Sequence, residues 1–192
     1  FDALSPDTTL VTIGIGGNDV GFSGVAIRCL NLVQIPLGPP PFGRPCVDGH
    51  TENGGDALAE RIEKARPDIA AAFGRITTLA PAARVFVVGY PVALPDDGIG
   101  CWPRVPVLDA DVAYLRDKFV EMNAMIREEA EAAGHVFIDI YSSSIGHDVC
   151  RPAESAWVNG LTLDPPGLPL HPNIRSHAHT AQVVADAIVS RR

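Results

Sequence analysis

The sequence predicts an α/β fold with a parallel β-sheet of the doubly wound type, and three observations support this prediction. Apolar runs at 9–15, 84–90 and 135–141 are typical of strands, and the first two have the composition of strands buried on both faces. Long segments with apolar residues at helical spacing separate these runs. Loops rich in Pro and Gly follow the expected carboxyl ends of the strands, where α/β proteins bind ligands.

The helices follow from hydrophobic spacing. Residues 56–79 predict a helix that Pro67 divides or kinks, because proline removes a helical hydrogen bond. Residues 109–133 predict a helix that ends at Gly134, and 178–189 predict a closing helix. The range 20–53 has no clear period and predicts a long loop with at most a short helical turn. This order of elements indicates a flavodoxin-like three-layer sandwich.

Length and charge restrict the possible functions. The 192 residues are enough for one core, and we expect a single domain over 1–192. The start, "FDAL" before Ser5, resembles the last turn of a helix, so we expect the domain to be N-terminally incomplete, with one or more strands outside this chain. The net charge of −8 and the thin spread of 15 basic residues argue against a nucleic-acid partner. No apolar run approaches the roughly 20 residues that a membrane-spanning helix needs.

The four cysteines predict two disulfides. Cys29, Cys46, Cys101 and Cys150 all lie in stretches rich in Pro and Gly, and none forms a C-x-x-C pair. We predict that Cys29 pairs with Cys46 and Cys101 with Cys150, because each pair brackets one loop region. Four reduced, buried thiols are the alternative. Disulfides indicate a secreted, extracellular protein, and this pattern does not predict a metal site.

The stretch "VTIGIGGNDVGF" presents Asn18 and Asp19 where the first predicted strand ends. Glycines at that point let the backbone turn sharply and leave the next side chains in the crevice at the carboxyl edge of the sheet. The amide NH2 of Asn18 would there be able to donate to an oxygen that becomes negative during acyl transfer. The alternative is that "GGND" is a turn in which the Asn and Asp side chains cap the following segment.

The stretch "LHPNIRSHAHTA" places His171 before Pro172 in the last loop. An imidazole held on a stapled loop, directly before a helix, suits a general base. The alternative is a solvent-exposed loop histidine. We do not predict a metal cluster of His171, His177 and His179, because helical phase directs His177 and His179 to opposite sides.

Together the two stretches resemble a known family. "IGGNDVGF" resembles the third block of the SGNH hydrolases, also called GDSL esterases and lipases, and "HPN" with the following His resembles their fifth block. "ARVFVVGYP" and "AWVNGL" are similar to the secreted, disulfide-bearing branch, whose usual three disulfides are here two. The resemblance implies a carboxylic ester hydrolase with a Ser–His acyl-enzyme mechanism and no cofactor. It assigns Asn18 to the oxyanion hole and His171 to the general base.

The chain departs from the family at the nucleophile. The sequence contains no GDS motif, so we expect the catalytic Ser and a second oxyanion donor upstream of Phe1. We expect the chain alone to be inactive. The complete protein is expected to be a monomer. Ser23 lies in "GFSGV", which fails the G-x-S-x-G pattern at its last position. Ser142–Ser144 stand too near His147 and Asp148 in sequence to suggest a triad. We therefore expect neither to be the nucleophile.

The acidic partner of the histidine is also missing, because Leu168 occupies the position three residues before His171. The carbonyl of Pro169 or Leu168 would accept from His171 Nδ1–H instead, and Asp164 is the fallback acid.

The expected substrate is an ester or lipid, with phospholipid, triacylglycerol and short esters all open. Two other readings remain: a flavodoxin-like binding module in which "GIGGND" cradles a phosphate, and a noncatalytic remnant.

Overall fold

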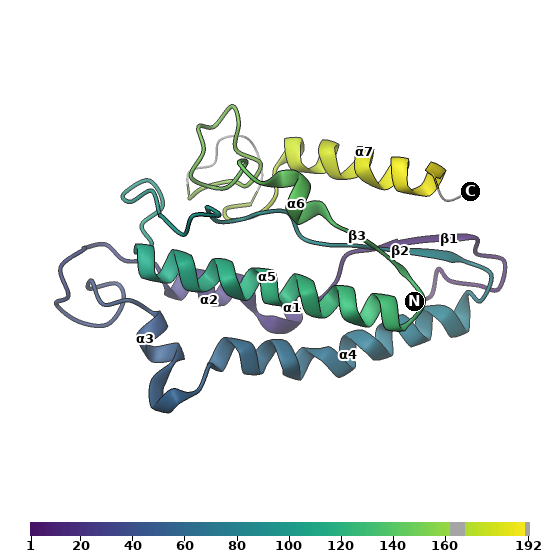
Figure 1. Cartoon of the computed structure of the whole chain (residues 1–192), viewed down its shortest axis with the longest axis horizontal. Coiled ribbons are helices and arrows are strands. Elements are labelled where there is room, and N and C mark those ends of the chain that lie inside the picture. The colour runs from purple at the N-terminus through teal and green to yellow at the C-terminus, as the bar shows by residue number, and fades with distance from the viewer. Residues whose placement is uncertain (162–167, 191–192) are drawn as a thin grey trace.

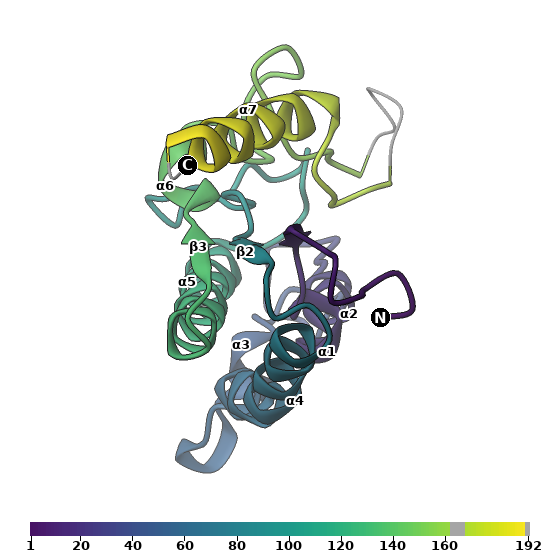
Figure 2. The ribbon, with the colours of Figure 1, turned by 90° about the vertical axis from the view of Figure 1, so that its right-hand side faces the viewer.

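The computed structural model describes residues 1–161 and 168–190, and it arranges them in three layers (Figures 1 and 2). The middle layer is a parallel sheet in the order β1-β2-β3. Its strands are β1 (Leu10–Ile13), β2 (Arg84–Val88) and β3 (Val136–Ile138). The prediction of an α/β fold with a parallel sheet in a three-layer sandwich is confirmed.

Three long helices form the outer layers. Helices α4 (Ala57–Leu79) and α5 (Asp109–Ala132) lie on one side of the sheet, and α7 (Ile174–Ser190) lies on the other (Figure 2). The short helices are α1 (Gly17–Val20), α2 (Phe22–Arg28), α3 (Val47–His50), the 3-10 turn η1 (Glu52–Gly54) and α6 (Ile140–Ser144). Loops 29–46, 89–108 and 145–161 project from the same end of the molecule (Figure 1).

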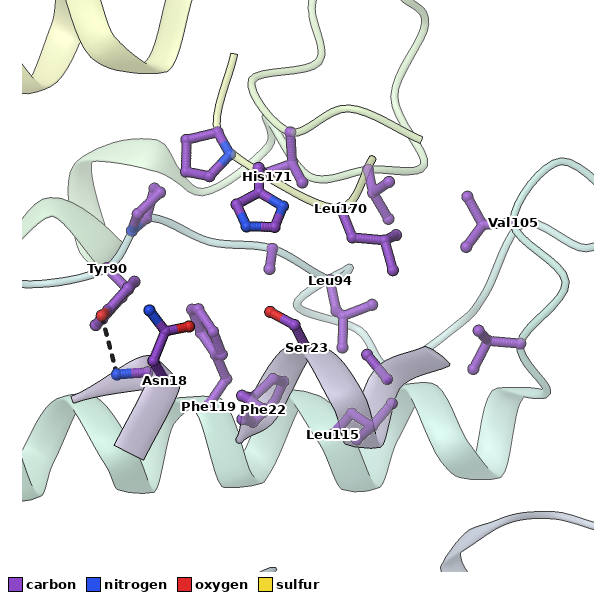
Figure 3. Close-up of a pocket in the computed structure, with 18 of the residues that line it drawn as sticks. Asn18, Phe22, Ser23, Tyr90, Leu94, Val105, Leu115, Phe119, Leu170 and His171 are labelled. Carbon is purple, nitrogen blue, oxygen red and sulfur yellow. Dashed lines mark hydrogen bonds between the residues drawn. The ribbon is translucent and has the colours of Figure 1, made fainter. Parts of the chain in front are cut away.

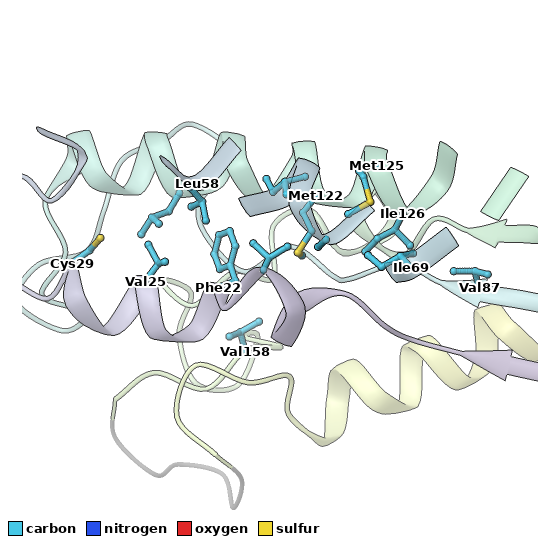
Figure 4. Packing of buried hydrophobic residues seen from close by; sticks show 14 of the residues in the cluster. Phe22, Val25, Cys29, Leu58, Ile69, Val87, Met122, Met125, Ile126 and Val158 are labelled. Atoms are coloured by element: carbon cyan, nitrogen blue, oxygen red, sulfur yellow. The ribbon is translucent and has the colours of Figure 1, made fainter. Parts of the chain in front are cut away.

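Two hydrophobic clusters hold the layers together. The larger joins α4, α5 and α2 to one face of the sheet (Figure 4). The smaller joins Phe86 and Ile138, on the opposite face, to Val183 and Ile188 of α7. The side chains of β2 therefore alternate between two cores, because successive residues of a strand point to opposite faces. The stripe predicted for α4 is the one that is buried: Leu58, Ile62, Ala65, Ile69, Phe73 and Ile76.

The structure corrects several expectations about the elements. The range 20–53 is not a loop throughout, because it contains α2, α3 and η1. Helix α2 forms because Phe22, Val25 and Cys29 lie on one buried side of it. Pro67 does not divide α4 into two helices, since the apolar stripe of the helix packs on both sides of the proline. The third run is strand only to Ile138, and α6 follows it.

A further correction concerns β1, which is not buried on both faces. Leu10 is 40% exposed, and the burial of β1 alternates between exposed and half-buried positions. Within residues 1–161 and 168–190, β1 pairs only with β2 and is an edge strand of the sheet.

The cysteines form two disulfides in the predicted pairing. Cys29 bonds to Cys46, and Cys101 bonds to Cys150. The first closes the loop between α2 and α3, and the second ties the loop after β2 to the loop after α6. Each bond restricts the unfolded chain more strongly than the native one, which is the usual source of disulfide stabilisation.

Asp56 begins α4 and connects it to α5. Its carboxylate accepts hydrogen bonds from the backbone N–H groups of Leu58 and Ala59 and from the hydroxyl of Tyr114, and it pairs with Lys118 Nζ at 2.6 Å. Burial acts to raise the pKa of Asp56, but the hydrogen bonds from Lys118, Ala59 and Tyr114 outweigh it and hold the pKa at about 2. One carboxylate thus caps one helix and anchors the next.

We predict that replacing Asp56 with Ala lowers the free energy of unfolding by about 1 to 2 kcal/mol, because α4 loses its cap. Asp56→Asn keeps an acceptor but loses the charge. Since the pKa of Asp56 is lowered on folding, the advantage of Asp over Asn is present above about pH 4 and disappears as the pH falls toward 2. Urea unfolding of both proteins at several pH values measures this. Asp68→Asn on the exposed side of α4 is the control, and a pH-independent difference for Asp56→Asn would contradict the prediction.

Candidate active site

The turn from β1 into α1 requires two glycines for different reasons. Gly16 has φ 112°, a conformation that L side chains rarely adopt, and a Cβ there would lie 3.0 Å from Ile126 Cδ1. A Cβ on Gly17 would lie 2.9 Å from Tyr90 Oη. The backbone therefore passes close to α5 and to the end of β2, and Asn18 follows at the carboxyl edge of the sheet.

Asn18 turns its side chain into a cavity (Figure 3). Gly16 and Gly21 are the N-caps of α1 and α2, and neither helix has a side-chain cap. Asn18 and Asp19 thus do not cap the segment that follows, which was the alternative explanation for these two residues. The amide of Asn18 is exposed to the cavity and can donate to a bound group.

Tyr90 positions the backbone that carries Asn18. The Gly17 N–H donates to Tyr90 Oη at 2.9 Å, and Asn123 of α5 holds Tyr90 by accepting from its N–H at 2.8 Å and donating to its carbonyl at 3.3 Å. Burial raises the pKa of the Tyr90 hydroxyl, so it stays protonated at neutral pH. Sequence analysis did not find this residue. Two signals pointed to it: its place two residues after β2, and its presence in the stretch "ARVFVVGYP" that resembles the family.

His171 is oriented by the main chain. Its Nδ1 lies 2.8 Å from the Pro169 carbonyl oxygen, so Nδ1–H donates there and Nε2 is the acceptor. The Leu168 carbonyl instead accepts from the His171 backbone N–H and from Asn159 Nδ2, each at 3.3 Å. Asp164, the fallback acid, lies outside the described residues. The imidazole is exposed, and its ring faces the cavity that Asn18 also lines (Figure 3).

A short antiparallel ladder fixes the backbone of the His171 loop. Val158 and Pro172 form an isolated β-bridge, the Asn159 N–H donates to the His171 carbonyl, and the Leu170 N–H donates to the Asn159 carbonyl. Leu170 has φ 58°, a strained conformation for a residue with a side chain. These main-chain bonds hold the strained turn. They also give the segment "AWVNGL" its structural role, since Val158 and Asn159 in it pair with the backbone around His171.

Asn173 attaches the same loop to α7. It is buried, its Nδ2 donates to the Ala156 carbonyl, and its Oδ1 accepts from the backbone N–H groups of Arg175 and Ser176 in the first turn. The closing helix begins at Ile174 rather than at 178 because this side chain satisfies its first amides.

The cavity between Asn18 and His171 is apolar and has a volume of about 210 Å³. Its walls come from α1, α2, α5, the three loops at this end of the molecule and the segment 170–172 before α7. Most of the wall is aliphatic or aromatic: Phe22, Ala26, Leu30, Leu94, Val105, Val107, Leu115, Phe119, Val149, Val158 and Leu170. An apolar cleft with a few convergent polar groups is typical of a small-molecule site.

The serines differ in their relation to this cavity. Ser23 lines it, and its side chain points toward His171, but no hydrogen bond joins the two residues in the described structure (Figure 3). Ser142 bonds to Asp139, Ser143 bonds to His179 and Ser144 is buried against Val92 and Tyr141. None of these three is among the described residues that line the cavity.

The groups that could hold a metal do not form a site with free ligands. Cys29, Cys46 and His50 have ligand atoms within 4.8 Å of one another, but the two sulfurs are joined in a disulfide and offer no thiolate. His179 bonds to Ser143 and packs on Trp157. His171, His177 and His179 do not form a metal-ligand cluster in the part of the chain that the structure describes.

Comparison with known proteins identifies the family of this chain. The family model of the GDSL-like lipases and acylhydrolases matches residues 1–179. The chain belongs to this family. Lipase 2 of Streptomyces coelicolor (strain ATCC BAA-471 / A3(2) / M145) is 32% identical over 190 residues, which are 98% of this chain and 62% of that protein. An esterase of Streptomyces scabiei is 27% identical over 216 residues, with 97% of this chain and 61% of that protein covered.

Solved structures show the same GDSL-like fold. A phospholipase A1 from Streptomyces albidoflavus NA297 superposes with a TM-score of 0.68 at 20% identity, covering 96% of this chain and 71% of that chain. An extracellular lipase from Streptomyces rimosus superposes with a TM-score of 0.61 at 26% identity, and the match covers 93% of this chain and 70% of that chain. The chain spans about three fifths of the length of the two sequence relatives.

We predict that Tyr90→Phe lowers the free energy of unfolding by about 1 to 3 kcal/mol, because the Gly17 N–H loses its partner in a partly buried place. Tyr141→Phe is the matched control, since the Tyr141 hydroxyl is buried without a hydrogen-bond partner among the described residues. The control should be neutral or stabilising. Urea unfolding of the two variants measures the difference, and equal effects would contradict the role assigned to Tyr90.

Proposed function

We propose that this chain supplies the general base and an oxyanion donor of a secreted carboxylic ester hydrolase. His171 Nε2 takes the proton of a serine hydroxyl as the serine oxygen attacks the ester carbonyl. The amide of Asn18 donates to the carbonyl oxygen as it becomes negative. His171 then returns the proton to the leaving alcohol, and water hydrolyses the acyl-enzyme by the same steps in reverse roles.

One observation carries this proposal: His171 and Asn18 line the same apolar cavity, and the Pro169 carbonyl holds His171 Nδ1. A carbonyl on Nδ1 selects the tautomer in which Nε2 accepts a proton, so no carboxylate is needed for orientation. Low polarity in the cavity strengthens a hydrogen bond from Asn18 to a developing charge. Family membership supports the same chemistry.

The nucleophile in this proposal is a serine of a GDS block outside residues 1–192. The sequence contains no GDS tripeptide, and Ser23 faces His171 without bonding to it. Ser23 also lies in the first turn of α2 and not on a tight strand-to-helix turn, where nucleophiles of this type are exposed. The free edge of β1 gives a preceding strand a place to pair.

The substrate in this proposal is an ester of an aliphatic acid, whose chain would occupy the apolar cavity. The relatives are named lipases and an esterase, and a structural neighbour is a phospholipase A1. Secretion is supported by the two disulfides and by the extracellular lipase among the neighbours. In the described part of the chain no helix has the length and apolarity to span a membrane.

The structure gives less support to the phosphate-binding alternative than to the hydrolase. A phosphate cradle at "GIGGND" would use free backbone N–H groups at the start of α1. The Gly17 N–H is already bonded to Tyr90, and the helix is only four residues long. The noncatalytic alternative is tested by the experiments that follow.

In an active protein that contains this chain, we predict that His171→Ala lowers kcat for p-nitrophenyl esters by at least about 1000-fold, because it removes the base. Asn18→Ala should lower kcat by about 100-fold to 1000-fold with little change in KM, because the amide acts mainly in the transition state. Asp164→Asn should retain most activity. Activity that depends on Asp164 but not on His171 would overturn the assignment.

We predict that residues 1–192 alone neither hydrolyse p-nitrophenyl butyrate nor react with a fluorophosphonate probe, because no serine bonds to His171 within residues 1–161 and 168–190. Adding a segment with a GDS block, fused or in trans, should restore both reactions. Labelling is read by mass spectrometry. Turnover by the isolated chain that is abolished by Ser23→Ala, but not by Ser143→Ala, would place the nucleophile at Ser23 instead.

A further inference from the structure

Exposed apolar side chains gather on the loop between α2 and α3. Residues 31–43, here called the apolar loop, contain no charged residue, and Gln34 is its one exposed polar side chain. Leu32, Ile35, Leu37 and Phe42 are between 57% and 74% exposed. The loop projects from the end of the molecule at which the cavity lies (Figure 1). Apolar groups concentrated in this way on a surface are typical of an interaction site.

The apolar loop is held in this conformation by its own polar groups. Asn31 is fully buried, with its Oδ1 accepting from the Gly43 N–H and its Nδ2 donating to the Arg44 carbonyl. The N–H groups of Leu37 and Gly38 both donate to the Phe42 carbonyl. The Cys29–Cys46 disulfide closes the base of the loop. The apolar side chains therefore stay on the outside, because Asn31 and the backbone fill the inside.

The loop is continuous with the cavity. Leu30, directly before it, and Ala26 of α2, one helical turn earlier, line the cavity wall. On its other side, Trp102 Nε1 donates to the Asn31 carbonyl at 3.0 Å, and the segment after Trp102 brings Val105 to the wall. Trp102 itself is 36% exposed. The apolar loop thus adjoins the apolar wall of the cavity at both of these places.

A positively charged side chain lies near each end of the apolar loop. Arg28 and Arg44 flank it and are exposed, and neither forms an ion pair within residues 1–161 and 168–190. An apolar centre between two guanidinium groups matches the boundary of a phospholipid layer, where acyl chains lie below a plane of phosphates. A half-exposed Trp is also typical of this depth.

We propose that the apolar loop docks the protein on the surface of phospholipid aggregates. Leu32, Leu37 and Phe42 enter the outer acyl-chain region, and Arg28 and Arg44 lie at the level of the phosphates. The proposal rests on the proposed function for its purpose, since docking places the cavity at the source of its substrate. Binding itself needs neither the nucleophile nor turnover.

Cosedimentation with extruded phosphatidylcholine vesicles tests this. The unmodified protein should bind, and the double variant Leu37→Ser/Phe42→Ser should bind roughly tenfold or more weakly, because two apolar side chains no longer leave water. The matched control is Val120→Ser/Val189→Ser, which removes two exposed apolar side chains from α5 and α7, and it should bind within about twofold of the unmodified protein. Thermal unfolding verifies that both variants are folded.

Three outcomes would overturn the proposal: no binding of the unmodified protein to vesicles, equal binding of the loop variant, or equal losses in the loop variant and the control. If size-exclusion chromatography with light scattering shows a dimer that only the loop variant dissociates, and vesicles are not bound, the loop is an interface between copies of this chain. The proposed function is judged separately with a soluble ester. The soluble ester is assayed with the protein that also carries the segment with the GDS block: turnover there without vesicle binding would refute the docking alone, and vesicle binding without turnover there would refute the hydrolase alone.

Discussion

The hydrogen bond from the Gly17 N–H to Tyr90 Oη joins the ends of β1 and β2, and the site depends on it. The two residues are 73 positions apart, and parallel pairing of the strands brings their carboxyl ends to one edge of the sheet. The side chain of Asn123 in α5 holds the backbone of Tyr90 through hydrogen bonds to its N–H and its carbonyl. Because Gly17 has no side chain, the hydroxyl approaches the backbone closely, and Asn18 is left facing the cavity.

On the opposite wall of the site, main-chain groups orient the His171 ring, a task for which a side-chain carboxylate is more common. The ladder between Val158 and Pro172 holds the loop, and the Pro169 carbonyl takes the Nδ1–H of His171. A carbonyl carries only a partial charge, so it orients the ring while stabilising an imidazolium less than a carboxylate would. Next to it, Leu170 has a strained backbone conformation, and its N–H donates a hydrogen bond to the Asn159 carbonyl. The loop is therefore ordered by its own main-chain hydrogen bonds.

The disulfides and the hydrogen bonds of the buried Asn31 link the long loops, whose composition supplies few packing contacts of its own. Stretches rich in Pro and Gly lack the periodic apolar residues that pack a helix or a strand. Here two covalent links and a few buried polar contacts take over that role at the end of the molecule that holds the cavity. Apolar side chains can then be displayed to the outside without collapse onto the core.

The sequence by itself determined the alternation of strands and helices, the buried stripe of α4, the cysteine pairing and the two loops that bring Asn18 and His171 together. The elements follow from local periodicity and turn chemistry, which neighbouring residues express. The cysteine pairing follows from the loop region that each pair brackets, and the assignment of Asn18 and His171 to one site follows from the family resemblance. Only the tertiary structure decided that Tyr90 holds Gly17, that Pro169 rather than Leu168 faces Nδ1, that α2 is helical and that β1 lies at an edge. Each of those depends on which distant group packs against a residue, and on the direction in which a carbonyl or hydroxyl points, and a sequence pattern encodes neither.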